Sequence, residues 1–133
     1  MKLLFVCKYN AGRSQMAQAL FNKFSKKHTS NSAGIKALER MNYPLPEFVV
    51  RDMNERGIDM SKYHRKQLTQ EMAERADKVI LFVPRRAWPE YLKNSPKAVY
   101  WKIADAKGKS YDFHCKIRDK IENLVTSLVK EIG

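Results

Sequence analysis

The first thirty residues change from a continuous apolar run to a helical repeat. After Lys2 the chain is apolar as far as Cys7, which is typical of a strand buried on both faces of a parallel sheet. A polar turn follows, and behind Ser14 the apolar residues recur at helical spacing. The pattern therefore predicts a strand, a short turn and a helix from about Ser14 to Lys27, with its buried face formed by Met16, Ala17, Leu20, Phe21 and Phe24.

Three later segments have the composition of strands. Thr29 to Ala33 predicts a short strand ended by Gly34, and residues 78–83 form the clearest apolar run after the first, stopped by Pro84. Residues 98–101, Ala-Val-Tyr-Trp, predict the last strand, and a polar loop covers 102–110.

Helical patterns separate these strands. One helix is expected from Pro46 to a cap at Gly57, with Val49, Val50 and Met53 inward, and short helices are expected after Thr69 and around residues 88–92. The longest begins at Ser110, and its apolar stripe consists of Phe113, Ile117, Ile121, Leu124, Val125, Leu128 and Ile132. Strands that alternate with helices predict an α/β fold, a parallel sheet with helices on both faces.

Length and composition restrict the class of protein. The 133 residues fit one domain over 1–133, and we find no linker or repeat. No apolar run approaches the roughly 20 residues of a membrane-spanning helix, and the start of the chain lacks a signal-peptide pattern, so we expect a cytoplasmic location and no membrane partner. The two cysteines, Cys7 and Cys115, are expected to be free thiols there.

The charge indicates anionic partners without naming them. Lys and Arg number 26 against 14 acids, a net charge of +12, which favours polyanions or small anionic substrates. The excess is spread along the chain, and no recognised nucleic-acid motif accompanies it, so a basic binding module for nucleic acid or an oxyanion is a minor alternative.

The first turn has the features of an oxyanion site. In an open parallel sheet, ligands bind at the carboxyl ends of the strands, and here a loop leads from such an end into a helix N-terminus, where backbone N–H groups converge. The field at this position favours a thiolate at Cys7, and Arg13 can bind two oxygens of a tetrahedral anion. Ser14 can donate a hydrogen bond to the sulfur, and Asn10 and Gly12 tolerate left-handed backbone. The expected cradle is Lys8, Tyr9, Asn10, Ala11, Gly12, Arg13 and Ser14.

A packing role for Cys7 is the main alternative at this stage. A lone cysteine that ends an apolar strand is commonly a core residue, and an arginine six residues after a cysteine is frequent by chance. The combination of strand, Cys, Asn, Gly and Arg-Ser at the start of an amphipathic helix favours the chemical role.

The sequence Val6-Cys-Lys-Tyr-Asn-Ala-Gly-Arg-Ser-Gln-Met-Ala17 resembles the active-site loop of the low-molecular-weight protein tyrosine phosphatase family, which also contains thiol-dependent arsenate reductases. The resemblance extends to Ser32-Ala-Gly34, Gly57-Ile-Asp59, Ala76-Asp77 and an Asp after Trp101, and so covers most of the chain. It implies a three-layer fold with a four-stranded parallel sheet. It also implies Cys7 as nucleophile, Arg13 as the ligand of the phosphoryl group, Ser14 as support for the thiolate and Asn10 as the residue that holds the loop.

Asp105 is the general acid that the resemblance implies. A leaving oxygen on phosphorus needs a proton, which accelerates the reaction by about 10²–10⁴, and Asp105 is the one acid in the loop after the last strand. Ala106 stands where the family has proline, which puts the positioning of Asp105 in question. Tyr9 and Trp101 are candidate aromatic walls for a phenolic substrate.

Two reactions remain open within the family. The primary hypothesis is hydrolysis of a phosphomonoester through a cysteinyl-phosphate intermediate, without metal or cofactor. Gln15 resembles the arsenate reductase branch instead, but the region that would hold two relay cysteines reads Ile80-Leu-Phe-Val-Pro-Arg-Arg86. Reduction of arsenate would therefore need an external thiol donor, or Cys115 would have to reach Cys7. Gly12 replaces the second loop cysteine of many family phosphatases.

Overall fold

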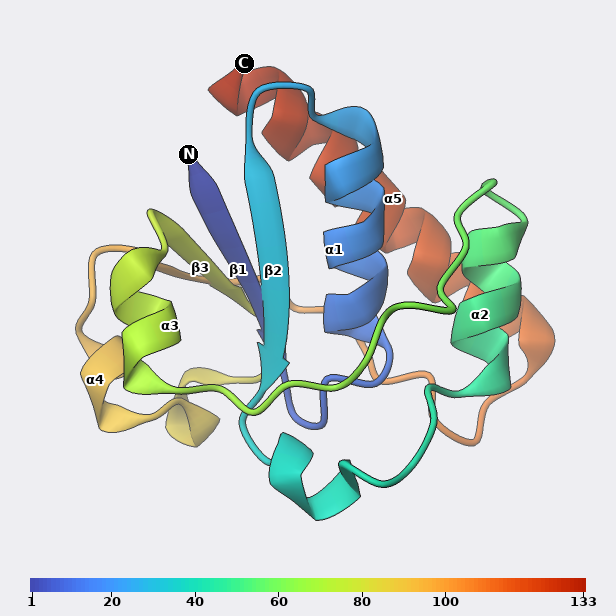
Figure 1. Ribbon diagram of the computed structural model, residues 1–133, viewed down its shortest axis with the longest axis horizontal. Coiled ribbons are helices and arrows are strands. Elements are labelled where there is room, and N and C mark those ends of the chain that lie inside the picture. The colour runs from blue at the N-terminus through green and yellow to red at the C-terminus, as the bar shows by residue number, and fades with distance from the viewer.

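A computed structural model describes residues 1–133 and contains one parallel sheet of four strands in the order β2-β1-β3-β4. The strands are β1 (Lys2–Cys7), β2 (Thr29–Gly34), β3 (Lys78–Leu81) and β4 (Ala98–Tyr100). Cys7, the last residue of β1, pairs with Gly34 of β2, and the strands run in one direction so that their carboxyl ends meet at one edge (Figure 1). The predicted α/β class and its four-stranded parallel sheet are confirmed.

Helices cover both faces of the sheet. Figure 1 shows α1 (Arg13–Phe24), α2 (Glu47–Asn54) and α5 (Tyr111–Ile132) on one side, and α3 (Gln70–Arg75) and α4 (Glu90–Lys93) on the other. The side chains of β1 alternate between the layers: Leu3, Phe5 and Cys7 join a core of 19 buried residues, whereas Leu4 and Val6 join one of 11. A strand with both faces covered explains why β1 is apolar throughout.

Two helices begin with a side-chain cap, and the one at Thr69 was predicted from the sequence. Thr69 Oγ1 accepts a hydrogen bond from the backbone N–H of Met72, and Ser110 Oγ accepts one from that of Phe113. Such a cap stabilises a helix by about 1 kcal/mol. Most of the predicted stripe of α5 is buried, whereas Leu124 is 36% exposed.

Several element boundaries differ from the sequence prediction. β3 ends at Leu81 and not at residue 83, although the N–H of Phe82 still bonds to Val6 O. The helix expected around 88–92 begins only at Glu90, as α4, because Pro89 before it has an extended ψ of 154°. A 3-10 turn, η2 (Arg85–Ala87), precedes it.

One expectation about the segment 34–57 is wrong. Val50 is 42% exposed, because adjacent residues of α2 point about 100° apart and Val49 takes the inward position. A second 3-10 turn, η1 (Ala37–Arg40), lies in a segment where the sequence predicted no element. Gly57 has the expected left-handed φ, at 74°, just after α2.

None of the helices combines the length and the apolar composition needed to cross a lipid bilayer.

Candidate active site

The predicted cradle joins the end of β1 to the start of α1. Cys7 is the last residue of the strand and is 3% exposed, and Arg13 is the first residue of the helix. The loop between them lies at the edge where the carboxyl ends of the strands meet (Figure 1). The N-terminus of α1 contains no acidic residue in its first turn, so nothing there neutralises the positive end of its dipole.

Asn10 holds the loop through its side chain and its backbone. It is fully buried and is the one non-glycine residue with a positive φ, 55°. Its Nδ2 donates to Ser14 Oγ at 2.8 Å and to Ser32 Oγ at 3.0 Å, while its Oδ1 accepts from the backbone N–H of Lys66 at 2.8 Å. Gly12, the other loop residue that tolerates left-handed backbone, has a φ of −119° and does not adopt it. Asparagine alone provides the left-handed turn.

Gly34 allows the neighbouring strand to approach the loop. A Cβ atom at this position would lie 2.6 Å from Asn10 N and 2.7 Å from the carbonyl carbon of Tyr9, which are backbone atoms and cannot turn aside. The absent side chain therefore lets β2 support the cradle directly.

Ser14 lies against the sulfur of Cys7. The distance from Ser14 Oγ to Cys7 Sγ is 2.8 Å, and both side chains are buried. Because Ser14 Oγ already accepts a hydrogen bond from Asn10, its own hydrogen is free to point at the sulfur. This arrangement favours the thiolate, since a charged sulfur is the stronger acceptor.

Arg13 is fixed on one side only. Its Nη1 donates to the carbonyl oxygens of Phe82 and Ile103, both at 2.9 Å. These bonds tie the first turn of α1 to the residue that follows β3 and to the loop after β4. Nε and Nη2 make no hydrogen bond within the protein, and Arg13 lines the same cavity as Cys7. The free edge of the guanidinium has the geometry to bind two oxygens of one anion.

Asp105 lines this cavity from the loop after β4. Its Oδ1 accepts a hydrogen bond from the backbone N–H of Lys107 at 3.0 Å, and the N–H of Lys109 bonds to Ala106 O at 3.1 Å. Ala106 itself is 4% exposed and belongs to the core beneath the loop. Turn hydrogen bonds and a buried methyl group therefore hold the loop at the position where the family has proline.

The cavity has a volume of about 450 Å³ and brings together Cys7, Arg13 and Asp105. Of the two candidate aromatic walls, Tyr9 lines it, whereas Trp101 packs on Phe5 and Phe82 in the core. The sequence analysis missed several of its lining residues, namely Arg40, Tyr43, Phe48, Arg65 and His114. Arg40, Tyr43 and Arg65 lie outside the predicted helices and strands. Phe48 and His114 lie on predicted helices but outside their apolar stripes, so no periodic signal marked them. His114 stacks on Phe48 with ring centroids 3.8 Å apart.

Arg65 adds a second buried cation near the sulfur. Its guanidinium donates to the backbone carbonyls of Tyr9, Tyr43 and Pro44 at 3.1–3.3 Å, so it links the cradle to the loop before α2. Burial lowers the pKa of Arg65, and a negative charge on Cys7 opposes that shift. An arginine remains charged under these conditions, and its charge favours the thiolate in turn.

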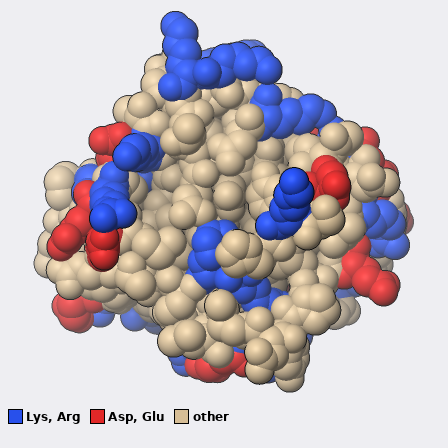
Figure 2. All heavy atoms as spheres, viewed as in Figure 1, with Lys and Arg blue, Asp and Glu red and all other residues tan.

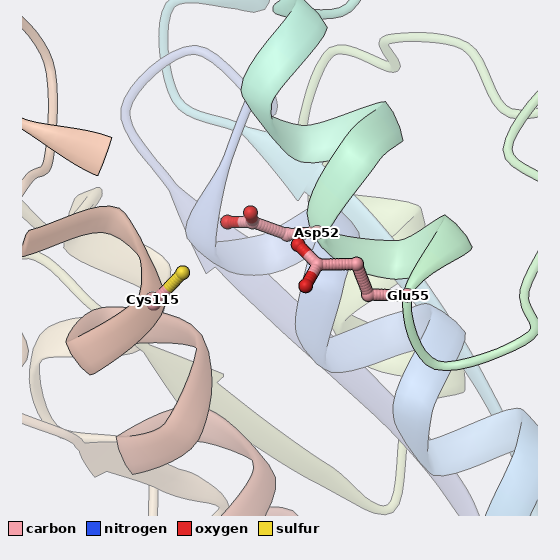
Figure 3. Close-up of side chains that lie close together, drawn as sticks. All are labelled: Asp52, Glu55 and Cys115. Atoms are coloured by element: carbon pink, nitrogen blue, oxygen red, sulfur yellow. The ribbon is translucent and has the colours of Figure 1, made fainter. Parts of the chain in front are cut away.

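Cys115 lies elsewhere, on α5 beside Asp52 and Glu55. Figure 3 shows the three side chains pointing toward one another, with their ligand atoms within 4.8 Å, which is the one grouping of this kind in the structure. Cys115 does not line the cavity of Cys7, so the two thiols are not arranged as a relay. Burial raises the pKa of Asp52, and neither of its oxygens has a hydrogen-bond partner.

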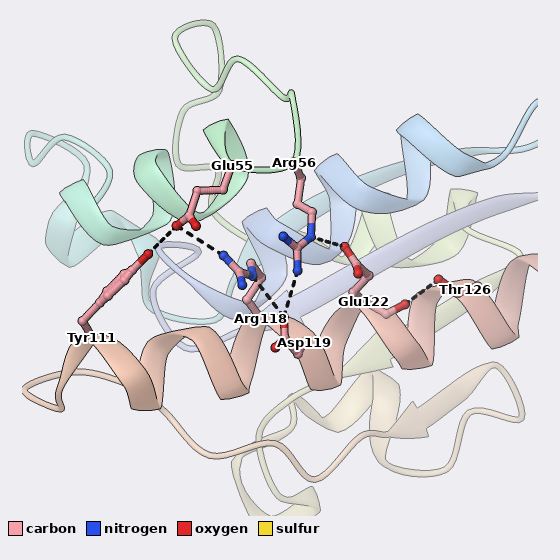
Figure 4. Close-up of polar contacts among 7 residues, drawn as sticks. All are labelled: Glu55, Arg56, Tyr111, Arg118, Asp119, Glu122 and Thr126. Atoms are coloured by element: carbon pink, nitrogen blue, oxygen red, sulfur yellow. Dashed lines mark hydrogen bonds and ion pairs between the residues drawn. The ribbon is translucent and has the colours of Figure 1, made fainter.

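The surroundings of this group are unfavourable for a metal ion. Glu55 accepts a hydrogen bond from the Tyr111 hydroxyl at 2.5 Å, which lowers the pKa of Glu55, and Arg118 Nη1 lies 3.4 Å from the same carboxylate (Figure 4). The positive charge of Arg118 acts on Asp52 as well. The contacts instead fasten the C-terminal end of α2 against α5.

Comparison with known proteins gives one family. The model of the family described as low molecular weight phosphotyrosine protein phosphatase matches residues 2–133. A probable low molecular weight protein-tyrosine-phosphatase, EpsP, of Ralstonia solanacearum is 39% identical over 79 residues, which are 59% of this chain and 53% of that protein. This chain therefore matches about half the length of that relative. A protein-arginine-phosphatase of Bacillus subtilis (strain 168) is 28% identical over 99% of this chain and 97% of its own.

Solved structures agree with these relatives. A low molecular weight protein tyrosine phosphatase from T. tengcongensis has a TM-score of 0.89 and 26% identity, covering 98% of this chain and 99% of that one. An arsenate reductase in the phosphate binding state has a TM-score of 0.84 and 25% identity, covering 99% and 98%. The matches extend over the whole sheet, its helices and the cradle.

Proposed function

Because this chain belongs to the low molecular weight phosphotyrosine protein phosphatase family, we propose that it is a cysteine-dependent phosphomonoesterase that dephosphorylates tyrosine residues. The family match confirms the resemblance drawn from the sequence of the loop. The observation that carries the proposed activity is the pairing of Cys7 Sγ with Ser14 Oγ at 2.8 Å in a cavity that Arg13 and Asp105 also line.

The proposed reaction has two displacement steps. In the first, the Cys7 thiolate attacks phosphorus, the bond from phosphorus to the ester oxygen breaks, and Asp105 gives its proton to the leaving oxygen. In the second, Asp105 takes a proton from water, the water oxygen attacks the cysteinyl phosphate, and inorganic phosphate leaves with the thiolate restored. Nε and Nη2 of Arg13 bind two phosphoryl oxygens in both steps, since Nη1 is occupied by carbonyl groups.

The lining of the cavity favours a phenolic phosphate over a phosphorylated guanidinium. Tyr9, Tyr43 and Phe48 supply aromatic surface for a phenyl ring, and Asp105 is the one carboxylate against five lysines and arginines. A phosphoarginine side chain would bring a further guanidinium group into a basic cavity, where it lacks acidic partners. Phosphotyrosine is therefore the substrate that the side chains of this site suit best.

Reduction of arsenate with an external thiol is the second candidate, and Gln15 favours it by resemblance. In the structure, however, Gln15 Nε2 donates to Asn10 and to His64 O, so the residue already has a supporting role under the cradle. With Cys115 outside the cavity, the reductant would have to be a small thiol that enters from solution.

We place the proposed activity in the cytoplasm. A catalytic thiol works only while reduced, and Cys7 and Cys115 are both free. We further propose that residues 1–133 act as one domain, with a phosphorylated protein as partner. Lys and Arg on the face seen in Figure 2 are dispersed and mixed with Asp and Glu, an arrangement that favours a local anion site over a broad nucleic-acid surface.

One set of assays on wild type and Cys7→Ser separates these candidates. A phosphotyrosine peptide, a phosphoarginine peptide, and arsenate with glutathione, mycothiol or a glutaredoxin system are supplied to each protein. We expect hydrolysis of the phosphotyrosine peptide by wild type and none by Cys7→Ser, which should still bind phosphate. Hydrolysis that survives in Cys7→Ser would refute the mechanism. Arsenite formation without hydrolysis would establish the second candidate, and salt-sensitive nucleic-acid binding without either activity would favour a binding module.

A further inference from the structure

The rim of the cavity contains cations that have no anionic partner. Arg13 and Arg65 are occupied by backbone carbonyls at the base, but Lys8, Arg40 and Lys107 also line the cavity. None of these three makes an ion pair, although ion pairs elsewhere in the molecule involve Arg56, Arg75, Lys93 and Arg118. A phosphate bound to Arg13 would not neutralise the positive charges of Lys8, Arg40 and Lys107.

Of the three, Arg40 lies against two aromatic rings. It is the last residue of η1, and its guanidinium carbon lies 5.0 Å from the ring centroid of Tyr9 and 5.4 Å from that of Tyr43. Lys8 Nζ lies 5.1 Å from the Tyr9 ring, so a second cation adjoins the same aromatic surface. Aromatic rings restrain a guanidinium while its N–H groups stay available, and the side chain of Arg40 donates no hydrogen bond within the protein.

A restrained guanidinium with free N–H groups fits a carboxylate. Its planar fork matches two carboxylate oxygens, and the side chain loses less rotational freedom on binding than an unrestrained arginine would. The position of Arg40 matters as well. Its guanidinium lies on the ring of Tyr9, which belongs to the cradle. A carboxylate bound to Arg40 would therefore come from a substrate residue only a few positions from the phosphotyrosine whose phosphate is held beside Cys7.

We propose that Arg40, assisted by Lys8 and Lys107, forms a carboxylate-binding rim that selects phosphotyrosine residues flanked by Asp or Glu. The proposal rests on the phosphotyrosine phosphatase function proposed above and adds the class of protein segment on which it acts. The partner is thus an acidic phosphorylated segment, and neutral or basic segments are disfavoured at the rim.

Matched peptides test the rim directly. Three phosphotyrosine peptides of equal length carry Glu, Gln or Lys at the positions on both sides of the phosphotyrosine. We expect kcat/KM for the Glu peptide to exceed that for the Gln peptide by roughly three- to tenfold at low salt, and the ratio to fall as salt rises. The Lys peptide should be the poorest of the three.

Variants assign the preference to Arg40. Arg40→Ala should bring the Glu to Gln ratio close to one, and Arg40→Glu should reverse it in favour of the Lys peptide. Lys27→Ala is the control: it removes one exposed positive charge from the loop between α1 and β2, at the opposite edge of the sheet, and should keep the ratio. Equal rates for the three peptides with wild type, or a ratio unchanged in Arg40→Glu, would overturn the proposal.

Binding measurements separate this proposal from the proposed function. Affinities of the same peptides for Cys7→Ser, measured by calorimetry, report on the rim without turnover. Preference for the Glu peptide in binding without hydrolysis by wild type would overturn the enzymatic function and support the rim. Hydrolysis of all peptides with equal affinities would leave the phosphatase intact and refute the rim.

Discussion

The hydrogen bond from Ser14 to Cys7 provides a quantitative test of how the site maintains a thiolate. Ser14→Ala removes the hydroxyl that lies 2.8 Å from the sulfur, while Asn10 Nδ2 keeps its second partner, Ser32 Oγ, at 3.0 Å. The loop should therefore retain its shape, and losing the Ser14 hydrogen bond should destabilise only the thiolate form of Cys7. A hydrogen bond to a charged group is worth about 1.5–3 kcal/mol. At about 1.36 kcal/mol per tenfold change, the rate at which Cys7 reacts as a thiolate at neutral pH should fall by roughly ten- to hundredfold.

The assay is the rate of alkylation of Cys7 by iodoacetamide across a pH series, followed by peptide mapping so that Cys115 is scored separately. The value of kcat/KM at neutral pH should fall by a similar factor. Ser32→Ala is the matched control, because it removes the other partner of Asn10 and leaves the sulfur untouched. A profile of Ser14→Ala that coincides with wild type, or an equal displacement in Ser32→Ala, would refute the reasoning.

Three further changes test other parts of the account. Asp105→Asn should lower kcat on a phosphotyrosine peptide by about 10²–10⁴, and less on p-nitrophenyl phosphate, whose leaving group needs less protonation; a loss below tenfold on the peptide would assign the acid elsewhere. Gly34→Ala should lower the free energy of unfolding in urea by about 1–3 kcal/mol and slow turnover, because its Cβ would lie 2.6 Å from Asn10 N; unchanged values would show that the cradle has room. Asp52→Asn should raise the free energy of unfolding at pH 7, since burial raises the pKa of Asp52 and the stability linked to its neutral form is lost as pH rises through that pKa. The difference in stability between Asp52→Asn and wild type should vanish below pH 3.8, the pKa of this aspartate in the unfolded chain. If Asp52→Asn is instead less stable than wild type at pH 7, the attraction of Arg118 for the carboxylate outweighs the cost of its burial.

The parts of the fold visible in the sequence were those that depend on local patterns. The apolar run of β1, the cap at Thr69, and the turn from Cys7 to Arg13 each follow from neighbouring residues. The prediction was less accurate where adjacent apolar residues cannot both face inward, as at Val50, which is 42% exposed beside the buried Val49.

The rest of the site could not be predicted, because it is assembled by long-range contacts. Arg65 reaches Tyr9 across 56 residues of sequence, and Arg40 meets the Tyr9 ring only because η1 follows the end of β2. No spacing rule connects such residues to Cys7. His114 lies on α5 but outside its predicted apolar stripe, and such a stripe does not tell which of the remaining side chains faces a cavity.

Exchange of oxygen between phosphate and water is the most direct test of the central claim that Cys7 bonds covalently to phosphorus. Formation of cysteinyl phosphate from inorganic phosphate releases one oxygen as water, and attack by bulk water restores phosphate with a new oxygen. The account predicts that wild type progressively removes ¹⁸O from labelled phosphate and that Cys7→Ser does not. A wild-type protein that hydrolyses p-nitrophenyl phosphate without such exchange, or exchange that persists in Cys7→Ser, would contradict it.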